Sequence, residues 1–161
     1  MNEHAAGAPA SKQERRLLLA VDGSENAQRA VAYVADFFAS LPAVRATLLT
    51  IVPIPAGDYF ANDTERATWV GERQEEARQM LATHVRILTG AGWPPERVAT
   101  QIEVLEVRSI ADRILEEQQR GGFCTVVIGR RGISRQEEFI FGSTSNRILH
   151  MAKDCAVLVV E

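Results

Sequence analysis

The sequence has few of the features that mark membrane, redox, metal-binding or nucleic-acid-binding proteins. Its two cysteines, Cys124 and Cys155, lie 31 positions apart without a C-x-x-C pair, which indicates neither a zinc nor a redox motif. The longest apolar runs have about five residues, whereas a membrane-spanning helix needs about 20. Since 18 Lys and Arg face 21 Asp and Glu, the formal charge of −3 creates no global attraction for nucleic acid or an anionic membrane. We expect a globular cytoplasmic protein with buried cysteines, and any anion site must be local.

A single domain is the expected organisation, because domains usually have about 100 to 200 residues and this chain has 161. Residues 1–16 are polar and Ala-rich without an apolar centre, so they have the pattern of neither a signal peptide nor a transit peptide. We expect a flexible tail over residues 1–15 and one domain over residues 16–161.

Five apolar segments have the composition of β-strands. Four are continuous apolar runs, typical of parallel strands covered on both faces. The third in chain order alternates polar and apolar residues, which indicates a sheet edge. The five expected strands are residues 17–21, 46–52, 98–105, 125–128 and 156–160.

Helical periodicity fills the intervals between these strands. Ser24 is expected to cap a helix that Pro42 ends. Ser109 and Asp112 form a capping box ahead of another helix, which Gly122 ends. The four expected helices are residues 25–41, 64–88, 110–121 and 143–153.

This alternation predicts an α/β fold, namely a doubly wound, open, five-stranded parallel sheet with helices on both faces (Rossmann-like). The strand order 3-2-1-4-5 places the alternating strand at an edge and the first strand in the centre. Ligands of such sheets bind outside the carboxyl ends of the strands, where the winding reverses. The sequence therefore predicts a site between Asp22, after the first strand, and Gly129, after the fourth.

The segment after the fourth strand has the composition of a phosphate-binding loop. Glycines such as Gly129 and Gly132 can adopt positive φ and let backbone N–H groups approach a ligand. Gly142 opens a helix, and the unpaired N–H groups and dipole of a helix N-terminus favour a phosphate. Hydroxyl donors follow at Ser143, Thr144 and Ser145.

Between residues 129 and 147, four arginines against two glutamates give this segment a local charge of +2. These residues are Arg130, Arg131, Arg135 and Arg147, with Glu137 and Glu138. The alternative interpretation is an ordinary βα loop in which Ser143 is a plain N-cap.

The glycine spacing matches neither the Walker loop nor the dinucleotide fingerprint. The pattern G-x2-G-x9-G-S, present as Gly129, Gly132, Gly142 and Ser143, resembles the ATP-binding motif of the universal stress protein family. The end of the first strand, which reads V-D-G-S over residues 21–24, resembles that family's V-D-x-S pattern. The resemblance is to the ATP-binding subgroup, whose fold is adenine nucleotide alpha hydrolase-like, and it covers residues 16–161.

The resemblance implies a stress-response regulator that holds ATP, with AMP or ADP as alternatives, together with Mg²⁺. It implies that Asp22 lies near the ribose, that Ile51 borders the adenine and that Ala20 lines the same pocket. From the residues alone, the alternative for Asp22 is a solvated turn residue that caps the first helix. The implied phosphate contacts are Gly129, Arg130, Arg131, Gly132, Ile133, Ser134, Arg135, Gly142, Ser143, Thr144 and Ser145.

Three positions depart from common usage in that family. Arg131 and Thr50 stand where histidine is frequent, and Ala156 replaces a proline before the last strand. These departures concern details of the pocket and the nucleotide preference more than binding itself.

Catalysis has little support in the sequence, because hydrolysis requires a positioned base and stabilisation of charge on the phosphoryl group. His84 and His150 fall within expected helices and His4 within the tail, so none lies at a strand end. We expect a regulator with at most slow hydrolysis. The alternatives are a Mg²⁺-dependent ATPase or phosphotransferase using Arg130 and Arg131, and a partner-binding dimeric module without nucleotide.

The last strand predicts an assembly, because an apolar edge at residues 156–160 is of the kind that proteins normally cover. We expect an isologous homodimer joined through this strand, which the family resemblance also implies. The loop over residues 54–63, with Tyr59 and Phe60, is a candidate surface for an unknown protein partner. Neither nucleic acid nor a membrane is an expected partner.

Overall fold

The computed structural model describes residues 14–130 and 143–161, and the segments 1–13 and 131–142 are not described. All but the last two positions of the expected tail therefore lie outside the described residues. The second of these two, Arg15, already belongs to the first strand, where its N–H donates to the carbonyl of Ala43.

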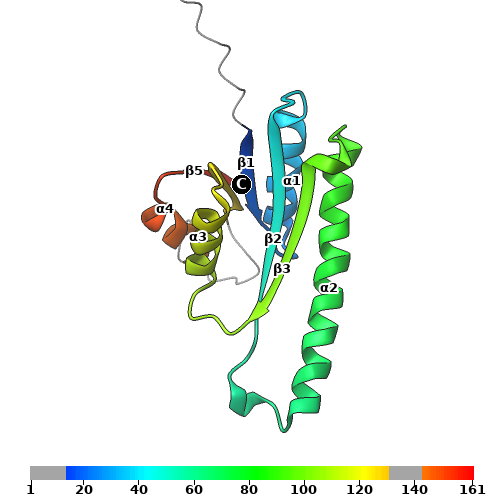
Figure 1. Cartoon of the computed structure of the whole chain (residues 1–161), viewed down its shortest axis with the longest axis vertical. Helices are drawn as coiled ribbons and strands as arrows, with labels where there is room; N and C mark the ends of the chain where they lie inside the picture. Colours follow the sequence, from blue (N-terminus) through cyan, green and yellow to red (C-terminus); the bar gives the residue numbers. More distant parts are fainter. Residues whose placement is uncertain (1–13, 131–142) are drawn as a thin grey trace, which may run out of the picture.

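Five parallel strands form one sheet in the order β3-β2-β1-β4-β5, which confirms the predicted fold class and order (Figure 1). The strands are β1 Arg15–Ala20, β2 Val44–Pro53, β3 Val98–Leu105, β4 Thr125–Gly129 and β5 Ala156–Val160. Two helices cover each face: α1 and α2 lie on one side, α3 and α4 on the other. The helices are α1 Glu25–Phe38, α2 Asp63–Gly90, α3 Ile110–Gly121 and α4 Ser143–Met151, with short 3-10 turns at Gly57–Tyr59 and Pro95–Arg97.

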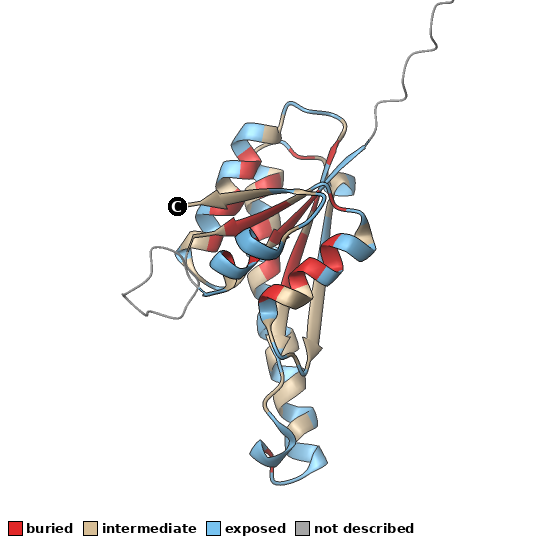
Figure 2. Ribbon diagram, turned by 90° about the vertical axis from the view of Figure 1, so that its left-hand side faces the viewer, coloured by how far each residue is buried: buried red, intermediate tan, exposed pale blue. Residues whose placement is uncertain are grey.

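The core consists of two apolar layers, one on each face of the sheet (Figure 2). Successive side chains of a strand point to opposite faces, so Leu17 and Leu19 pack with α1 and α2, while Leu18 packs with α3 and α4. Both faces of the central strands are covered, which explains their uninterrupted apolar sequence. Trp93 is buried on the α1/α2 side, where its Nε1 donates to the carbonyl of Ala35 at 3.1 Å.

The expected caps are present. The Ser24 Oγ accepts from the N–H of Ala27 at 3.1 Å, and the Ser109 Oγ accepts from the N–H of Asp112 at 3.2 Å. Gly122 ends α3 in the left-handed region, with φ of 62°. These contacts fix the directions in which α1 and α3 leave the sheet.

Several expectations from the sequence are wrong. The last helix ends at Met151 rather than at residue 153. The first helix ends at Phe38 rather than at residue 41, and Leu41 is exposed, so no burial extends the helix to that point. The cysteines are not buried either, because Cys124 is exposed in the turn before β4 and Cys155 is half-buried before β5.

The sheet is uneven at its carboxyl end. β1 stops at Ala20, opposite Leu49, whereas β2 and β3 remain paired as far as Pro53 and Leu105. α2 extends past the ends of these strands, beside the loop that contains the 3-10 turn Gly57–Tyr59 (Figure 1). Its buried side chains all lie in its second half, at Ala77, Leu81, His84 and Leu88. Within residues 14–130 and 143–161, no helix combines the length and the apolar character needed to cross a membrane.

Candidate functional site

The carboxyl ends of β1 and β4 lie side by side at the predicted switch point. Ala20 and Ile128 are paired in the ladder, so the chain that follows each strand leaves the sheet at the same place. α1 begins just after β1, and α4 is joined to the end of β4 through Ser145. The strand ends and two helix N-termini therefore converge in one region, as the sequence predicts.

Asp22 is half-buried directly after β1. Its Oδ1 accepts from the N–H of Ser24 at 2.9 Å, which forms the turn that leads into α1. Asp22 is thus a turn residue, as one interpretation had it, but it is half-buried and the N-cap of α1 is Ser24. A carboxylate has about four lone-pair sites, so this bond leaves acceptor capacity for a ligand hydroxyl.

Ala20 and Ile51 lie on the α3/α4 face of the sheet. Both are half-buried, and both pack against the apolar cluster that includes Leu49 and Ile148. Ile51 lies two residues beyond Leu49, the partner of Ala20, so both side chains point to the same face. Together they can form a small apolar floor beside Asp22, suited to a flat apolar group such as a purine.

Gly129 is required at the end of β4, but not for the expected reason. The positive-φ glycines of the described chain are Gly92 and Gly122, and Gly129 is not among them. A Cβ at Gly129 would instead lie 2.7 Å from the carbonyl carbon and 2.8 Å from the carbonyl oxygen of Asn26. Glycine at this position permits the first turn of α1 to pack against β4.

Ser145 connects α4 to the start of the glycine loop. It is 4% exposed, and its Oγ lies 2.9 Å from the carbonyl oxygen of Gly129 and 3.0 Å from that of Arg130. A serine hydroxyl has one proton, and here that proton is directed to these carbonyls, so Ser145 braces the loop. Ser143 is exposed and Thr144 is half-buried at the N-terminus of α4, where phosphate contact stays a prediction.

The two arginines of this region that the structure describes are both paired with carboxylates. Arg130 Nη2 lies 2.6 Å from the Glu161 carboxylate. Arg147 donates twice to Asp112 on α3, with Nε at 2.6 Å and Nη2 at 2.9 Å, which holds the pKa of the Asp112 carboxyl below its usual value. The local charge of +2 over residues 129–147 includes the charges of Arg130 and Arg147. Glu161 and Asp112, which lie outside that segment, neutralise these two charges.

Several predicted phosphate contacts lie outside the described residues, together with both glutamates of the loop. These positions are Arg131, Gly132, Ile133, Ser134, Arg135 and Gly142, with Glu137 and Glu138.

His84 is a residue of this region that the sequence interpretation missed. It reaches from α2 to the end of β1, where its Nε2 lies 3.3 Å from the carbonyl oxygen of Asp22. The residue is 4% exposed, and this burial lowers the pKa of the imidazole below its usual value. Its spacing from Leu81 and Leu88 marks the buried face of α2, which is the signal that could have identified it.

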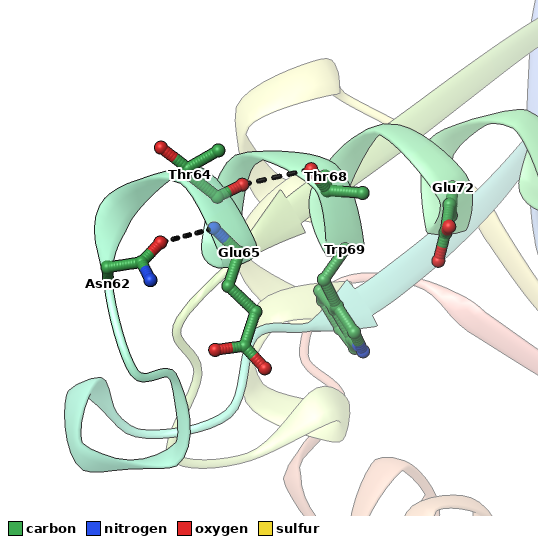
Figure 3. Close-up of a pocket in the computed structure, with 6 residues that line it drawn as sticks. All are labelled: Asn62, Thr64, Glu65, Thr68, Trp69 and Glu72. Atoms are coloured by element: carbon green, nitrogen blue, oxygen red, sulfur yellow. Dashed lines mark hydrogen bonds between the residues drawn. The ribbon is translucent and has the colours of Figure 1, made fainter.

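A separate surface pocket lies at the start of α2, with a volume of about 550 Å³. Its polar contacts are ordinary helix contacts: Asn62 Oδ1 accepts from the Glu65 N–H, and Thr68 Oγ1 donates to the Thr64 carbonyl (Figure 3). Across the described part of the chain, no group of three or more His, Cys, Asp or Glu side chains is placed to hold a metal ion. The pocket is lined by Asn62, Thr64, Glu65, Thr68, Trp69 and Glu72.

Comparison with known proteins identifies a family. A model described as the universal stress protein family matches residues 14–161. No curated protein matches the sequence significantly.

Solved structures of similar fold cover nearly the whole chain. The hypothetical protein MJ0577 is 21% identical with a TM-score of 0.76, over 92% of this chain and 96% of its own. Universal stress protein UspA from Lactobacillus plantarum is 20% identical with a TM-score of 0.74, over 92% and 99%. The Archaeoglobus fulgidus universal stress protein in complex with dAMP is 19% identical with a TM-score of 0.61, over 92% and 99%. At these identities the likeness shows the fold.

Proposed function

The chain belongs to the universal stress protein family, and we propose that it binds an adenine nucleotide at the junction of β1 and β4. The observation that carries the proposal is the convergence of Asp22, the apolar pair Ala20 and Ile51, and the N-terminus of α4 at one switch point. The dAMP complex of the Archaeoglobus fulgidus relative supports the choice of an adenine nucleotide. We infer ATP as the ligand, with AMP or ADP as alternatives, in a cytoplasmic stress-response regulator.

Each part of the nucleotide has a matching group in this arrangement. The adenine packs on Ala20 and Ile51, and the Asp22 carboxylate accepts from the ribose hydroxyls. The phosphates lie at Ser143 and Thr144, where the N–H groups of the first turn of the nine-residue helix α4 lack internal partners. Bound Mg²⁺ would neutralise part of the phosphate charge. The remaining phosphate contacts are Gly129, Arg130 and the loop residues 131–135 and 142.

Retention of the nucleotide suits this site better than rapid turnover. Arg130 is paired with Glu161, so it must exchange this carboxylate for a phosphate before it can stabilise charge there. Ser145 holds the loop start through backbone carbonyls rather than offering its proton to a ligand. We therefore infer a regulator in which hydrolysis is at most slow.

Calorimetric titration with ATP, ADP and AMP, with and without Mg²⁺, tests the proposal. Asp22→Asn keeps an oxygen that can accept from the Ser24 N–H but removes the charge, so its nucleotide Kd should rise about tenfold while the fold is retained. Asp36→Asn removes an exposed acid elsewhere on α1 and serves as the matched control. No heat and no thermal stabilisation of the wild-type protein with any of the three nucleotides would refute the function.

We further infer an isologous homodimer formed through β5. β5 is an edge of the described sheet, and Val157 to Val160 on it are half-buried. The elements in contact with β5 carry exposed apolar side chains, at Tyr33 and Phe37 on α1 and at Leu149 and Met151 on α4. An apolar edge flanked by apolar side chains fits a second copy of the chain.

A further inference from the structure

His84 lies against the backbone of the proposed ribose-binding residue. Its Nε2 is 3.3 Å from the carbonyl oxygen of Asp22, and because a carbonyl only accepts, the hydrogen of the neutral ring is on Nε2. The other ring nitrogen, Nδ1, is buried and has no hydrogen-bond partner among the described residues. The neutral ring can thus donate to the Asp22 carbonyl through Nε2, while the lone pair of Nδ1 accepts from no donor among the described residues.

The surroundings of His84 are apolar. The buried cluster on this face of the sheet takes Val31 and Val34 from α1 and Leu81 and Leu88 from α2 itself. The residues three and four positions from His84 on α2 are the apolar Met80, Leu81, Ile87 and Leu88, and Asp22 is the charged group that acts on the ring. A leucine would fill such a place without leaving a buried nitrogen unpaired. Packing alone therefore does not account for a histidine here.

Asp22 is held by two contacts from different sides. Its carboxylate accepts from the Ser24 N–H at 2.9 Å, and its carbonyl accepts from His84. The first contact belongs to the local turn, whereas the second ties the turn to α2, 62 residues further along the chain. Removing the second contact leaves Asp22 with the local turn but without its tie to α2.

We propose that His84 is a positioning residue for nucleotide binding, an inference that rests on the proposed function. The ring fixes the main chain of Asp22, so that the free acceptor sites of the carboxylate face the ribose hydroxyls. Preorganisation of this kind lowers the cost of ordering the site when the ligand binds. It also connects the affinity of the site to the position of α2.

The test compares two substitutions by titration calorimetry with ATP at pH 7.5. His84→Leu removes the donor, and its Kd should rise about tenfold. His84→Gln keeps an N–H donor and should stay within about threefold of the wild-type Kd. Leu81→Met changes the same face of α2 without touching Asp22 and should bind like the wild-type protein. If the wild-type protein binds ATP and His84→Leu binds it with the same Kd, the positioning role is overturned and the proposed function stands. If the wild-type protein binds no nucleotide, the proposed function is overturned as well.

If His84→Leu does not fold, the pH dependence of the Kd for ATP tests the positioning role instead. Protonation leaves the Nε2–H donor in place but puts a charge and an unpaired Nδ1–H on a buried ring, and burial outweighs the Asp22 contact in lowering the pKa of His84. Displacement of the charged ring toward water should therefore lower wild-type affinity relative to His84→Gln between pH 7.5 and about 5.5. Titration of the ATP phosphates is common to both proteins and cancels in the ratio of their Kd values. A wild-type Kd that rises severalfold more than that of His84→Gln supports the role, and parallel profiles overturn it.

Discussion

Gly129 is the point at which the end of β4 meets the first turn of α1. A Cβ there would lie 2.7 Å from the backbone of Asn26, and backbone atoms cannot move aside as the end of a flexible side chain can. We expect Gly129→Ala to lower the free energy of unfolding by about 1–3 kcal/mol, measured by urea denaturation. Because the same contact aligns the two sides of the site, the variant should also bind nucleotide more weakly.

Gly71 gives the matched control for this substitution. It lies within α2, and an added Cβ would meet no atom within 4 Å. Gly71→Ala should therefore raise the free energy of unfolding by about 1 kcal/mol, because alanine is the better helix former. Equal effects of the two changes would show that the close approach of Asn26 does not constrain position 129.

His84 predicts a pH dependence of stability. Burial lowers its pKa in the folded protein below the usual value of a histidine, about 6.5, so the unfolded chain binds the proton more readily. The contribution of neutral His84 to the free energy of unfolding is complete above about pH 6.5 and is lost as the pH falls from there toward the folded pKa. Urea denaturation at a series of pH values should show a steeper loss between pH 7 and 5 for the wild-type protein than for His84→Gln. His150→Gln, at an exposed position of α4, should follow the wild-type curve.

At the scale of elements, α3 and β3 are joined by an ion pair that is largely shielded from water. Arg113 donates through Nη2 to Glu103 at 2.9 Å and through Nε to the other carboxylate oxygen, and the side chains are 18% and 11% exposed. The Arg113 guanidinium lowers the pKa of the Glu103 carboxyl. The contribution of the pair is therefore complete above the normal pKa of a glutamate and is lost as the pH falls through the lower folded value.

Glu103→Gln should lower the free energy of unfolding by about 1–3 kcal/mol, since it leaves Arg113 partly unpaired in a shielded place. Glu116 also pairs with Arg113 but is 64% exposed, so Glu116→Gln should change stability by less than about 0.5 kcal/mol. Chemical denaturation at pH 7 separates the two. Similar losses of stability in Glu103→Gln and Glu116→Gln would mean that shielding the Glu103–Arg113 pair from water adds nothing to the free energy of unfolding.

The elements could be predicted from the sequence because their causes are local. Apolar runs mark strands covered on both faces, and Ser24, Ser109 and Gly122 mark helix ends through contacts with residues a few positions away. The exposure of Cys124 was missed because strand composition does not show which flanking turns the helices leave uncovered.

The site was predicted less completely, because its decisive contacts join residues far apart in sequence. Asp112 pairs with Arg147 over 35 positions, and His84 meets Asp22 over 62. Neither a local charge count nor a helical period contains such pairings. The strand order that places the candidate site between β1 and β4 was predictable nonetheless.

At the scale of the whole molecule, β5 presents a free edge whose backbone groups can be assigned. The N–H of Ala156 donates to the carbonyl of Cys124, just before β4, and the carbonyl of Val160 accepts from the N–H of Arg130, just after it. Since successive residues of a strand direct their backbone groups to opposite sides, those of Val157 and Val159 point to the free edge.

Val159→Pro should therefore convert the proposed dimer into a monomer without disturbing the pairing with β4, because it removes an outward N–H. Analytical ultracentrifugation at micromolar concentration measures the change. Leu158→Pro, which removes an N–H directed to β4, should instead lower thermal stability. A wild-type protein that sediments as a monomer would contradict the dimer.

The unequal support of α2 has a consequence for hydrogen exchange. All buried residues of this helix lie from Ala77 onward, while its first half extends past the end of β1. A helix segment with little tertiary packing opens locally at low free energy, so its amide hydrogens should exchange with deuterium much faster than those around Leu81 and Leu88. Any molecule that binds the first half would slow that exchange, while the protected second half of the same helix supplies an internal reference. α2 would then report binding along its own length without an attached probe.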